Sequence, residues 1–314
     1  MRHVFLIASM VLAVSAMAAE GPPAWAYGTD PSTARPRAPQ ATPDVSLQHL
    51  PDSTLAFTRA QIGDRFGPAD WYPGDHPPMP EVVAHGRKPT VMACSLCHYP
   101  NGKGRPENAG VAGFPASYFI EQMKEFKDGD RKSADTRKKN TGVMSAIAQA
   151  MTDEEIKAAA DYFGSMKWTP WIRVVESATA PKTYTSVGMY LPLEAGGTEP
   201  LGERIIEVPE QPEATEALRN PRSGFIAYVP VGSIEKGKAA TIQCGICHGA
   251  DLKGSGPVPS IAGRSPSYLV RQMYDMQQGT RKGTWTELMK PVVAKLSQED
   301  MLNMAAYISS RRSE

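Results

Sequence analysis

The chain has 314 residues, with 34 lysines and arginines against 33 aspartates and glutamates, and 4 cysteines. This length predicts about two domains. The balanced charge argues against a nucleic-acid-binding protein, which normally carries a basic excess. Beyond the N-terminus, no segment approaches the roughly 20 apolar residues of a membrane-spanning helix. The 28 prolines are expected to gather outside regular elements.

The first 18 residues are typical of a secretory signal. A basic start at Arg2 and His3 precedes the apolar run 4–14, and a small-x-small cleavage site precedes Ala19. An uncleaved membrane anchor is the weaker interpretation, because the run is short for crossing a bilayer. We therefore predict a mature chain that begins near Ala19 and works in the periplasm, without a membrane span once the signal is cleaved.

The cysteines fall in two identical motifs, Cys94-Ser95-Leu96-Cys97-His98 and Cys244-Gly245-Ile246-Cys247-His248. The same offset (94 to 244) repeats a series of further residues, and after Arg131 the offset shortens by five, as from Met144 to Met289. The chain is therefore a tandem duplication of a unit of roughly 80 residues. The residues repeated at the longer offset are Gly113 and Gly263, Tyr118 and Tyr268, Gln122 and Gln272, Met123 and Met273, Gly129 and Gly279, and Arg131 and Arg281.

Each repeat is predicted to be a small helical domain. One helix should lead into each cysteine motif, from about Val82 and about Ser233, and a second should follow Pro115 in the first repeat. The last helix of each repeat should open with a capping box, at Thr152 and at Ser297. Neither repeat has an alternating pattern that would indicate strands.

Cys-x-x-Cys followed at once by His is the attachment signature of c-type haem. Residues three apart share a helix face, so both thiols can bond vinyl groups on one edge of a porphyrin while the His coordinates the iron. A thioredoxin-like pair needs a βαβ setting, a zinc site needs both motifs together, and a disulfide leaves the His unexplained. We therefore predict two covalent haem c groups, held by thioether bonds to Cys94, Cys97, Cys244 and Cys247, with His98 and His248 as axial iron ligands.

Two methionine pairs survive the alignment of the repeats. Met123 and Met273 lie within the second helix on its apolar face, where core packing is the simpler interpretation. Met144 and Met289 lie between the second and last helices, where a loop could fold over the open face of the haem. We predict Met144 and Met289 as the sixth ligands, because thioether ligation raises the potential and suits electron transfer.

Two other sets of side chains are candidates for haem contacts. His76 and His85 are alternative ligands in the first repeat, but they have no counterpart in the second and are better interpreted as surface or propionate-contacting residues. Arg131 and Arg281 recur at one position, where each either bonds a haem propionate or ends a helix. Both interpretations of the arginines stay open on the sequence alone.

The first repeat carries a basic insertion of five residues. A solvated loop is the default interpretation. The alternative is a docking patch for an acidic redox partner, which would speed encounter more than it tightens binding. The basic residues there are Lys132, Arg137, Lys138 and Lys139.

Each repeat resembles a class I cytochrome c domain, and the pair resembles the soluble di-haem cytochromes of the c4 group. The family pattern is present twice, over about 82–166 and 232–310: haem motif, Ala-Gly, a helix with Tyr, a Gly-x-Arg turn, an axial Met and a final helix with Tyr. Family domains often place a Pro whose carbonyl accepts the hydrogen bond of the axial His. Pro259 matches, whereas Ala109 stands at the aligned position in the first repeat, with Pro106 as the alternative there.

The resemblance implies an all-α fold of two tandem class I cytochrome c domains, with a Pro-rich irregular N-terminal extension and inter-domain linker. Two short linker runs, 171–176 and 204–208, could pair as an antiparallel ribbon. Tryptophans in the proline-rich segments favour chain that lies over the domains rather than free disorder. The expected organisation is a signal peptide (1–18), the extension (19–81), domain 1 (82–167), an acidic linker (168–231) and domain 2 (232–314).

We interpret the protein as a periplasmic electron carrier that passes single electrons between a dehydrogenase and an oxidase or small carrier, or as the haem subunit of a dehydrogenase complex. The alternative is a di-haem enzyme such as a cytochrome c peroxidase, which needs one open haem. The aligned Met144 and Met289 argue against it. A thiosulfate-type oxidoreductase with a Cys axial ligand would need a fifth cysteine, and nothing positive supports an assembly factor.

Overall fold

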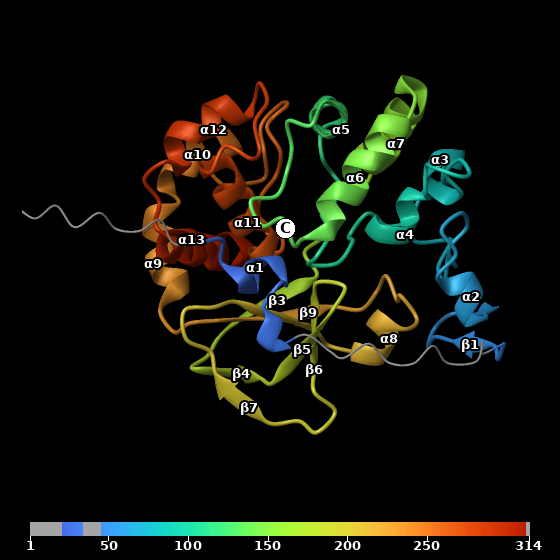
Figure 1. Ribbon diagram of the computed structural model, residues 1–314, viewed down its shortest axis with the longest axis horizontal. Helices are drawn as coiled ribbons and strands as arrows, with labels where there is room; N and C mark the ends of the chain where they lie inside the picture. Colours follow the sequence, from blue (N-terminus) through green and yellow to red (C-terminus); the bar gives the residue numbers. More distant parts are fainter. Residues whose placement is uncertain (1–20, 34–44, 312–314) are drawn as a thin grey trace, which may run out of the picture.

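The computed structural model describes residues 21–33 and 45–311, so the predicted signal peptide lies outside the described residues. The two repeats lie side by side, one coloured teal to green and the other orange to red, and the strands of the linker lie below them (Figure 1). Within the described ranges, no helix combines the length and apolarity that a bilayer span requires.

The first repeat is helical, as predicted. Thr152 accepts from the backbone N–H of Glu155 and completes the expected capping box. The helix expected from Val82 is a single turn, because the chain reverses at Gly86, where φ is 66° and a Cβ would collide with the carbonyl oxygen of Val91. The helices are α3 (Glu81–Ala84), α4 (Cys94–His98), α5 (Ala116–Asp128), α6 (Lys139–Ala150) and α7 (Asp153–Gly164).

The second repeat follows the same plan. Ser265 and Ser297 cap their helices by accepting from the N–H groups of Tyr268 and Asp300. The first helix packs closely on the last, since a Cβ at Gly237 would collide with the carbonyl oxygen of Asn303. The elements are α9 (Ser233–Ala240), the 3₁₀ turn η2 (Ile242–Cys244), α10 (Gly245–His248), α11 (Pro266–Gln277), α12 (Thr286–Val293) and α13 (Gln298–Ser310).

The linker is folded, and the prediction of an irregular segment was wrong. Its prolines do not prevent strands because Pro181, Pro192, Pro200 and Pro209 are each the last residue of a strand, where a missing N–H is tolerated. The elements are β3 (Ile172–Glu176), β4 (Thr179–Pro181), β5 (Thr183–Ser186), β6 (Met189–Pro192), β7 (Thr198–Pro200), β8 (Ile206–Pro209), α8 (Pro212–Glu216) and β9 (Phe225–Val229).

The two linker runs expected to form a ribbon are strands, but they do not pair with each other. β9 lies between them, parallel to β3 and antiparallel to β8. β4 pairs with β7 and β5 with β6, both antiparallel. Alternate residues of β9, beginning with Phe225, are buried and join the core of domain 2 beside Ile172 and Met301. The sheet is therefore anchored to the second domain.

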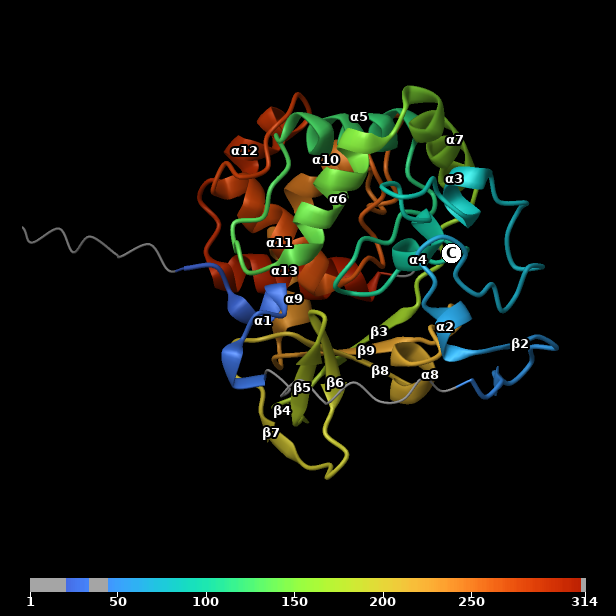
Figure 2. The ribbon, with the colours of Figure 1, turned by 45° about the vertical axis from the view of Figure 1, so that its right-hand side comes forward.

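The N-terminal extension packs against both domains, as the tryptophans suggested. Tyr27 donates to the Asp275 carboxylate of α11 at 2.7 Å, and Trp71 donates to the carbonyl oxygen of Leu218 at 2.7 Å. The segment around α2 lies beside α8 of the linker (Figure 2). The elements are α1 (Ala24–Tyr27), η1 (Pro31–Thr33), β1 (Gln48–His49), β2 (Ala56–Phe57) and α2 (Arg59–Ile62), with β1 antiparallel to β2.

A buried carboxylate ties the linker to α11, and this makes the two serine caps of domain 2 unequal. Ser265 donates to Glu207 at 2.9 Å and Ser267 N–H donates to it at 2.7 Å. Ser265→Ala should therefore lower the free energy of unfolding by about 3 kcal/mol, the sum of a lost cap and a lost bond to a charged group. Guanidinium unfolding of the haem-loaded protein measures this. Ser297→Ala, at an exposed cap, should cost about 1 kcal/mol, and equal losses would contradict the role of Glu207.

Candidate functional site

The two domains pack through residues that recur in both repeats. Arg131 donates to the hydroxyl of Tyr268 at 3.1 Å and to the Gln272 side chain at 2.9 Å. In the same way, Arg281 donates to the hydroxyl of Tyr118 at 3.1 Å and to the Gln122 side chain at 2.8 Å. The sequence-based interpretations of these arginines, a helix end or a propionate contact, did not include this pairing between the domains. We call these six residues the interdomain latch.

Backbone and side-chain bonds extend the latch. Lys132 N–H donates to the carbonyl of Thr280 at 2.8 Å, and Lys282 N–H donates to that of Asp130 at 2.7 Å. Arg264 of domain 2 is buried between the rings of Phe114 and Trp168, with its guanidinium carbon 4.0 and 3.9 Å from the ring centroids. Burial lowers the pKa of Arg264 to about 9, and the two aromatic faces offset part of that cost.

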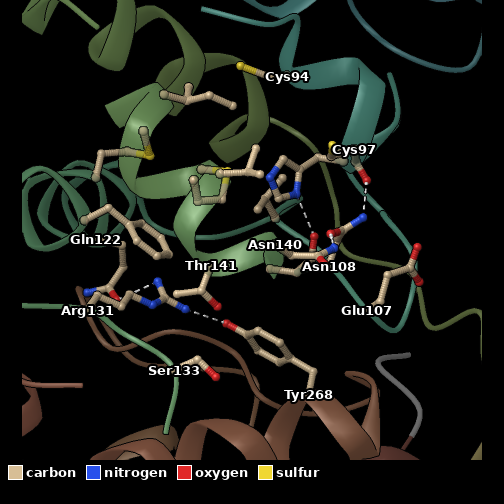
Figure 3. Close-up of a pocket in the computed structure, with 18 of the residues that line it drawn as sticks. Cys94, Cys97, Glu107, Asn108, Gln122, Arg131, Ser133, Asn140, Thr141 and Tyr268 are labelled. Atoms are coloured by element: carbon tan, nitrogen blue, oxygen red, sulfur yellow. Dashed lines mark hydrogen bonds between the residues drawn. The ribbon is translucent and has the colours of Figure 1, made fainter. Parts of the chain in front are cut away.

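A cavity of about 320 Å³ lies in domain 1 beside the first cysteine motif. Cys94, Cys97, His98 and Met144 all line it, with apolar residues of α5 and α7. Figure 3 shows Cys94 on one side of the cavity and Arg131, Ser133 and Tyr268 on the opposite side. The cavity thus has a thiol side and a polar side that faces domain 2.

Domain 2 has the corresponding cavity, of about 190 Å³. Cys244, Cys247, His248 and Met289 line it. Met144 and Met289 lie within α6 and α12, so the loop expected to carry them is helical. Met123 and Met273 are buried and line the same cavities, so each cavity holds more than one thioether.

Both motif histidines are oriented by a backbone carbonyl. His98 Nδ1 lies 2.8 Å from the carbonyl oxygen of Ala109, and His248 Nδ1 lies 2.8 Å from that of Pro259. The accepting atom belongs to the backbone, so a proline is unnecessary, and the alternative at Pro106 was wrong. Burial lowers the pKa of both imidazoles. Each ring is therefore neutral, with Nε2 free to bind a metal.

The polar side of the first cavity contains buried hydrogen-bond donors that could bind an anion. Lys138 and Ser133 both line it, and neither Lys138 Nζ nor Ser133 Oγ has a hydrogen-bond partner. Burial lowers the pKa of the Lys138 ammonium to about 7. An apolar macrocycle that carries two carboxylates would satisfy both the apolar lining and these donors. The residues present therefore fit haem c.

The basic insertion departs in part from the sequence-based expectation, and His76 and His85 do not reach the cavities. Lys138 is buried and Arg137 is paired with Asp135 at 2.8 Å, so these two basic residues do not belong to an open docking patch. Lys132 and Lys139 are exposed and line the first cavity. His76 bonds Asp70 and Tyr162, His85 bonds Glu81, and neither lines either cavity. The burial of Lys138 had no signal in the sequence, because Arg271 and Asp275, which line the same cavity, belong to α11 of the other domain.

The two cavities share a wall at the domain interface. Phe114 and Tyr118 of domain 1, with Tyr268 and Gln272 of domain 2, line both of them. Three of these four belong to the latch. The sequence analysis singled out Tyr118, Tyr268 and Gln272 because they recur at the repeat offset, but it predicted no role for them.

Comparison with known proteins identifies the family. The cytochrome c family model matches residues 83–167 and 234–312, about half of the chain. The chain belongs to the cytochrome c family. Two matched domains, each with a Cys-x-x-Cys-His motif, imply two covalently bound haem c groups. The chain is a di-haem electron-transfer protein, and its relatives are named as carriers rather than enzymes.

Its relatives include cytochromes of the c4 group. It is 26% identical over 227 residues to the thiosulfate dehydrogenase electron acceptor of Thiomonas intermedia, a match that covers 71% of this chain and 80% of that protein. Cytochrome c4 of Pseudomonas aeruginosa is 38% identical over 82 residues, or 26% of this chain and 39% of that protein. A solved cytochrome c4 from Acidithiobacillus ferrooxidans has a TM-score of 0.44 at 24% identity, covering 69% of this chain and 98% of that chain.

Lys138 should tune the potential of the first haem. A buried positive charge favours the reduced iron, which carries one positive charge less. We expect Lys138→Met to lower one of the two reduction potentials at pH 6, on the order of 50 mV, or about tenfold in a one-electron equilibrium. In the unaltered protein, this potential should fall as the pH rises through about 7, where the amine loses its proton.

Spectroelectrochemical titration of the two haems measures this effect. Arg137→Met is the matched control, because Arg137 lies in the same loop but is exposed and paired with Asp135. A potential that is unchanged or higher in Lys138→Met would contradict the prediction.

Proposed function

We propose that the protein carries single electrons from a dehydrogenase to an oxidase or small carrier in the periplasm. One observation carries the proposal: two cavities, each with a haem motif and a methionine, share a wall of four residues. An electron taken up in one domain therefore has a short path to the other. When bound, haem c supplies a one-electron iron couple, and the chain sets its ligands and surroundings.

The cysteines and axial residues have distinct roles in this proposal. Cys94 and Cys97 hold one haem by thioether bonds, and Cys244 and Cys247 hold the other. Burial raises the pKa of Cys94 to about 12, so this thiol stays protonated and inert towards unwanted oxidation until it is attached. His98 and His248 would bind iron through Nε2, since Nδ1 of each is held by a carbonyl oxygen.

Met144 and Met289 would supply the remaining iron ligand in each domain. They are aligned between the repeats and line the two cavities from α6 and α12. A closed sixth position keeps the coordination unchanged between redox states and excludes peroxide and dioxygen. This distinguishes a carrier from a di-haem peroxidase, which needs an open position.

The donor is proposed to be a dehydrogenase because two relatives, from Thiomonas intermedia and Stutzerimonas stutzeri, are named thiosulfate dehydrogenase electron acceptors. The predicted signal peptide supports the periplasm as the compartment. The folded extension and linker suit a protein that docks to a larger partner, either transiently or as the haem subunit of a dehydrogenase complex.

Carbon monoxide tests the axial methionines. The fully reduced protein should show no rapid spectral change with carbon monoxide, because both irons are closed. Met144→Ala should open one haem to rapid binding and Met289→Ala the other, which stopped-flow absorption measures. Met123→Leu and Met273→Leu are the matched controls and should stay closed. Rapid binding by the unaltered protein would overturn the pure carrier function and favour the peroxidase alternative.

The exposed lysines beside the first cavity should steer an acidic partner. Lys132→Gln with Lys139→Gln should slow electron exchange at low salt several-fold and flatten its salt dependence, because long-range attraction between exposed charges is screened by salt. Stopped-flow exchange with an acidic ferredoxin-type probe measures both effects. Arg137→Gln serves as the control, since its charge is already paired with Asp135. If neither the rate nor the salt slope changes, there is no docking patch at this site.

A further inference from the structure

One histidine of the extension has hydrogen-bond acceptors facing both of its ring nitrogens. The His76 side chain is 4% exposed, and its Nε2 lies 3.1 Å from the Asp70 carboxylate. Its Nδ1 lies 2.9 Å from the carbonyl oxygen of Pro77 and 3.1 Å from the hydroxyl of Tyr162 in α7. A carboxylate and a carbonyl only accept, so both are satisfied when each ring nitrogen carries a proton. That form of His76 is the imidazolium.

The Tyr162 hydroxyl connects this histidine to the chain that follows the first cysteine motif. It donates its one proton to the carbonyl oxygen of Pro100 at 2.7 Å, two residues after His98. Its oxygen is therefore left to accept from Nδ1 of His76. The hydrogen bonds thus run in one direction, from the extension through α7 to the end of the motif.

A neutral His76 loses part of this arrangement. With its proton on Nε2 for Asp70, Nδ1 becomes an acceptor whose lone pair faces the carbonyl oxygen of Pro77. The Tyr162 hydroxyl then bonds either Nδ1 or the Pro100 carbonyl, and the other acceptor is left without a donor. With the proton on Nδ1 instead, Nε2 faces the carboxylate without a hydrogen between them. Each neutral tautomer therefore leaves a buried group unsatisfied, which costs free energy.

The groups around His76 favour the charged ring. Burial lowers the pKa of His76, but the hydrogen bonds to Asp70 and Pro77 and the nearby negative charges outweigh burial and raise the pKa above its usual value of 6.5. The facing groups are Asp70 and Asp75 of the extension and Tyr162 of α7, with Arg222 of the linker and Lys103 of domain 1 beside Asp75.

The segment that carries His76 also binds the linker. Asp75 accepts two hydrogen bonds from the Arg222 guanidinium, both at 2.7 Å. Trp71 donates to the carbonyl oxygen of Leu218 at 2.7 Å. His76 supplies the contact with α7, so the segment joins the linker to domain 1. We call residues 70–78 the extension clamp.

Domain 2 contains the same tyrosine without the histidine. Tyr307 aligns with Tyr162, but its ring lies under the guanidinium of Arg311, which is 5.7 Å from the ring centroid. His248 is the one histidine between residues 232 and 314, and it belongs to the haem motif. A response to the protonation of a histidine beside this tyrosine is therefore confined to domain 1.

We propose that His76 makes the extension clamp a pH-sensitive contact, closed on domain 1 when the ring is protonated and loosened when it is neutral. Deprotonation moves one proton from Nδ1 to water and turns the Tyr162 proton from Pro100 towards Nδ1. Because the pKa of His76 is raised in the folded protein, the clamp is fully stabilised below pH 6.5. It loses this stabilisation as the pH rises through the raised value. The device does not depend on the proposed function.

Hydrogen exchange of the full-length, haem-loaded protein tests the clamp, measured by mass spectrometry at about pH 5.5 and about pH 8.5 on either side of the histidine transition. After correction for intrinsic rates, peptides from 70–78 and 99–104 should exchange about tenfold faster at the higher pH. His76→Gln should abolish this pH dependence, because an amide does not titrate. His85→Gln is the matched control and should keep it, since His85 bonds only Glu81, at 3.1 Å, and its side chain is 57% exposed.

A second measurement keeps the proposal testable where His76→Gln folds poorly. Nuclear magnetic resonance titration of the His76 ring in the unaltered protein should give a midpoint above pH 6.5. Asp70→Asn should move this midpoint to lower pH, because a neutral amide no longer favours the imidazolium, and should leave the midpoint of His85 in place. A His76 midpoint at or below 6.5 in the unaltered protein would contradict the proposal.

Three exchange results would also overturn it. The first is exchange of 70–78 that does not depend on pH in the unaltered protein. The second is a pH response that persists in His76→Gln, and the third is an equal loss of that response in His85→Gln. None of these measurements involves electron transfer, so failure of the clamp and failure of the proposed function are distinguished.

Discussion

The arrangement of the molecule depends on two arginines that each bridge the same two glutamines. Arg131 and Arg281 both donate to Gln122 and Gln272, at 2.8 to 2.9 Å. Two guanidinium groups this close repel each other, and the buried carboxylate of Glu125 supplies the opposing charge. Burial raises the pKa of Glu125 while the arginines oppose the rise. Each arginine bonds residues of both domains, so the cluster fixes the domains beside the shared wall between the cavities.

Around this fixed pair, the extension and the linker make two similar domains unequal. They cover the thiol side of domain 1 through Arg65 and Arg219 and leave that of domain 2 exposed. Charged side chains also differ, since Lys138 and Glu107 line the first cavity without counterparts among the residues that line the second. Equal domains would let a donor and an acceptor compete for the same sites.

The features that local sequence controls were predictable. Short-range patterns predict the helical repeats and the capping boxes at Thr152 and Ser297. The cysteine motifs predict covalent attachment of haem c. The linker sheet was not predictable, because β3 meets β9 from far along the chain, and proline content argued for irregular structure. The burial of Lys138 was also hidden, since its surroundings include Gly188 of the linker and Arg271 of the other domain. Long-range packing, rather than propensity, accounts for each difference.

The latch has the symmetry of a homodimer. Arg131 donates to Tyr268 of the second repeat, and Arg281 donates to the equivalent Tyr118 of the first. An isologous interface between identical subunits has the same reciprocity. A single-domain ancestor with the same tyrosine, glutamine and arginine would have presented a self-complementary surface. Joining two such copies would need no new interface. The linker sheet occupies the covalent connection that such a fusion requires.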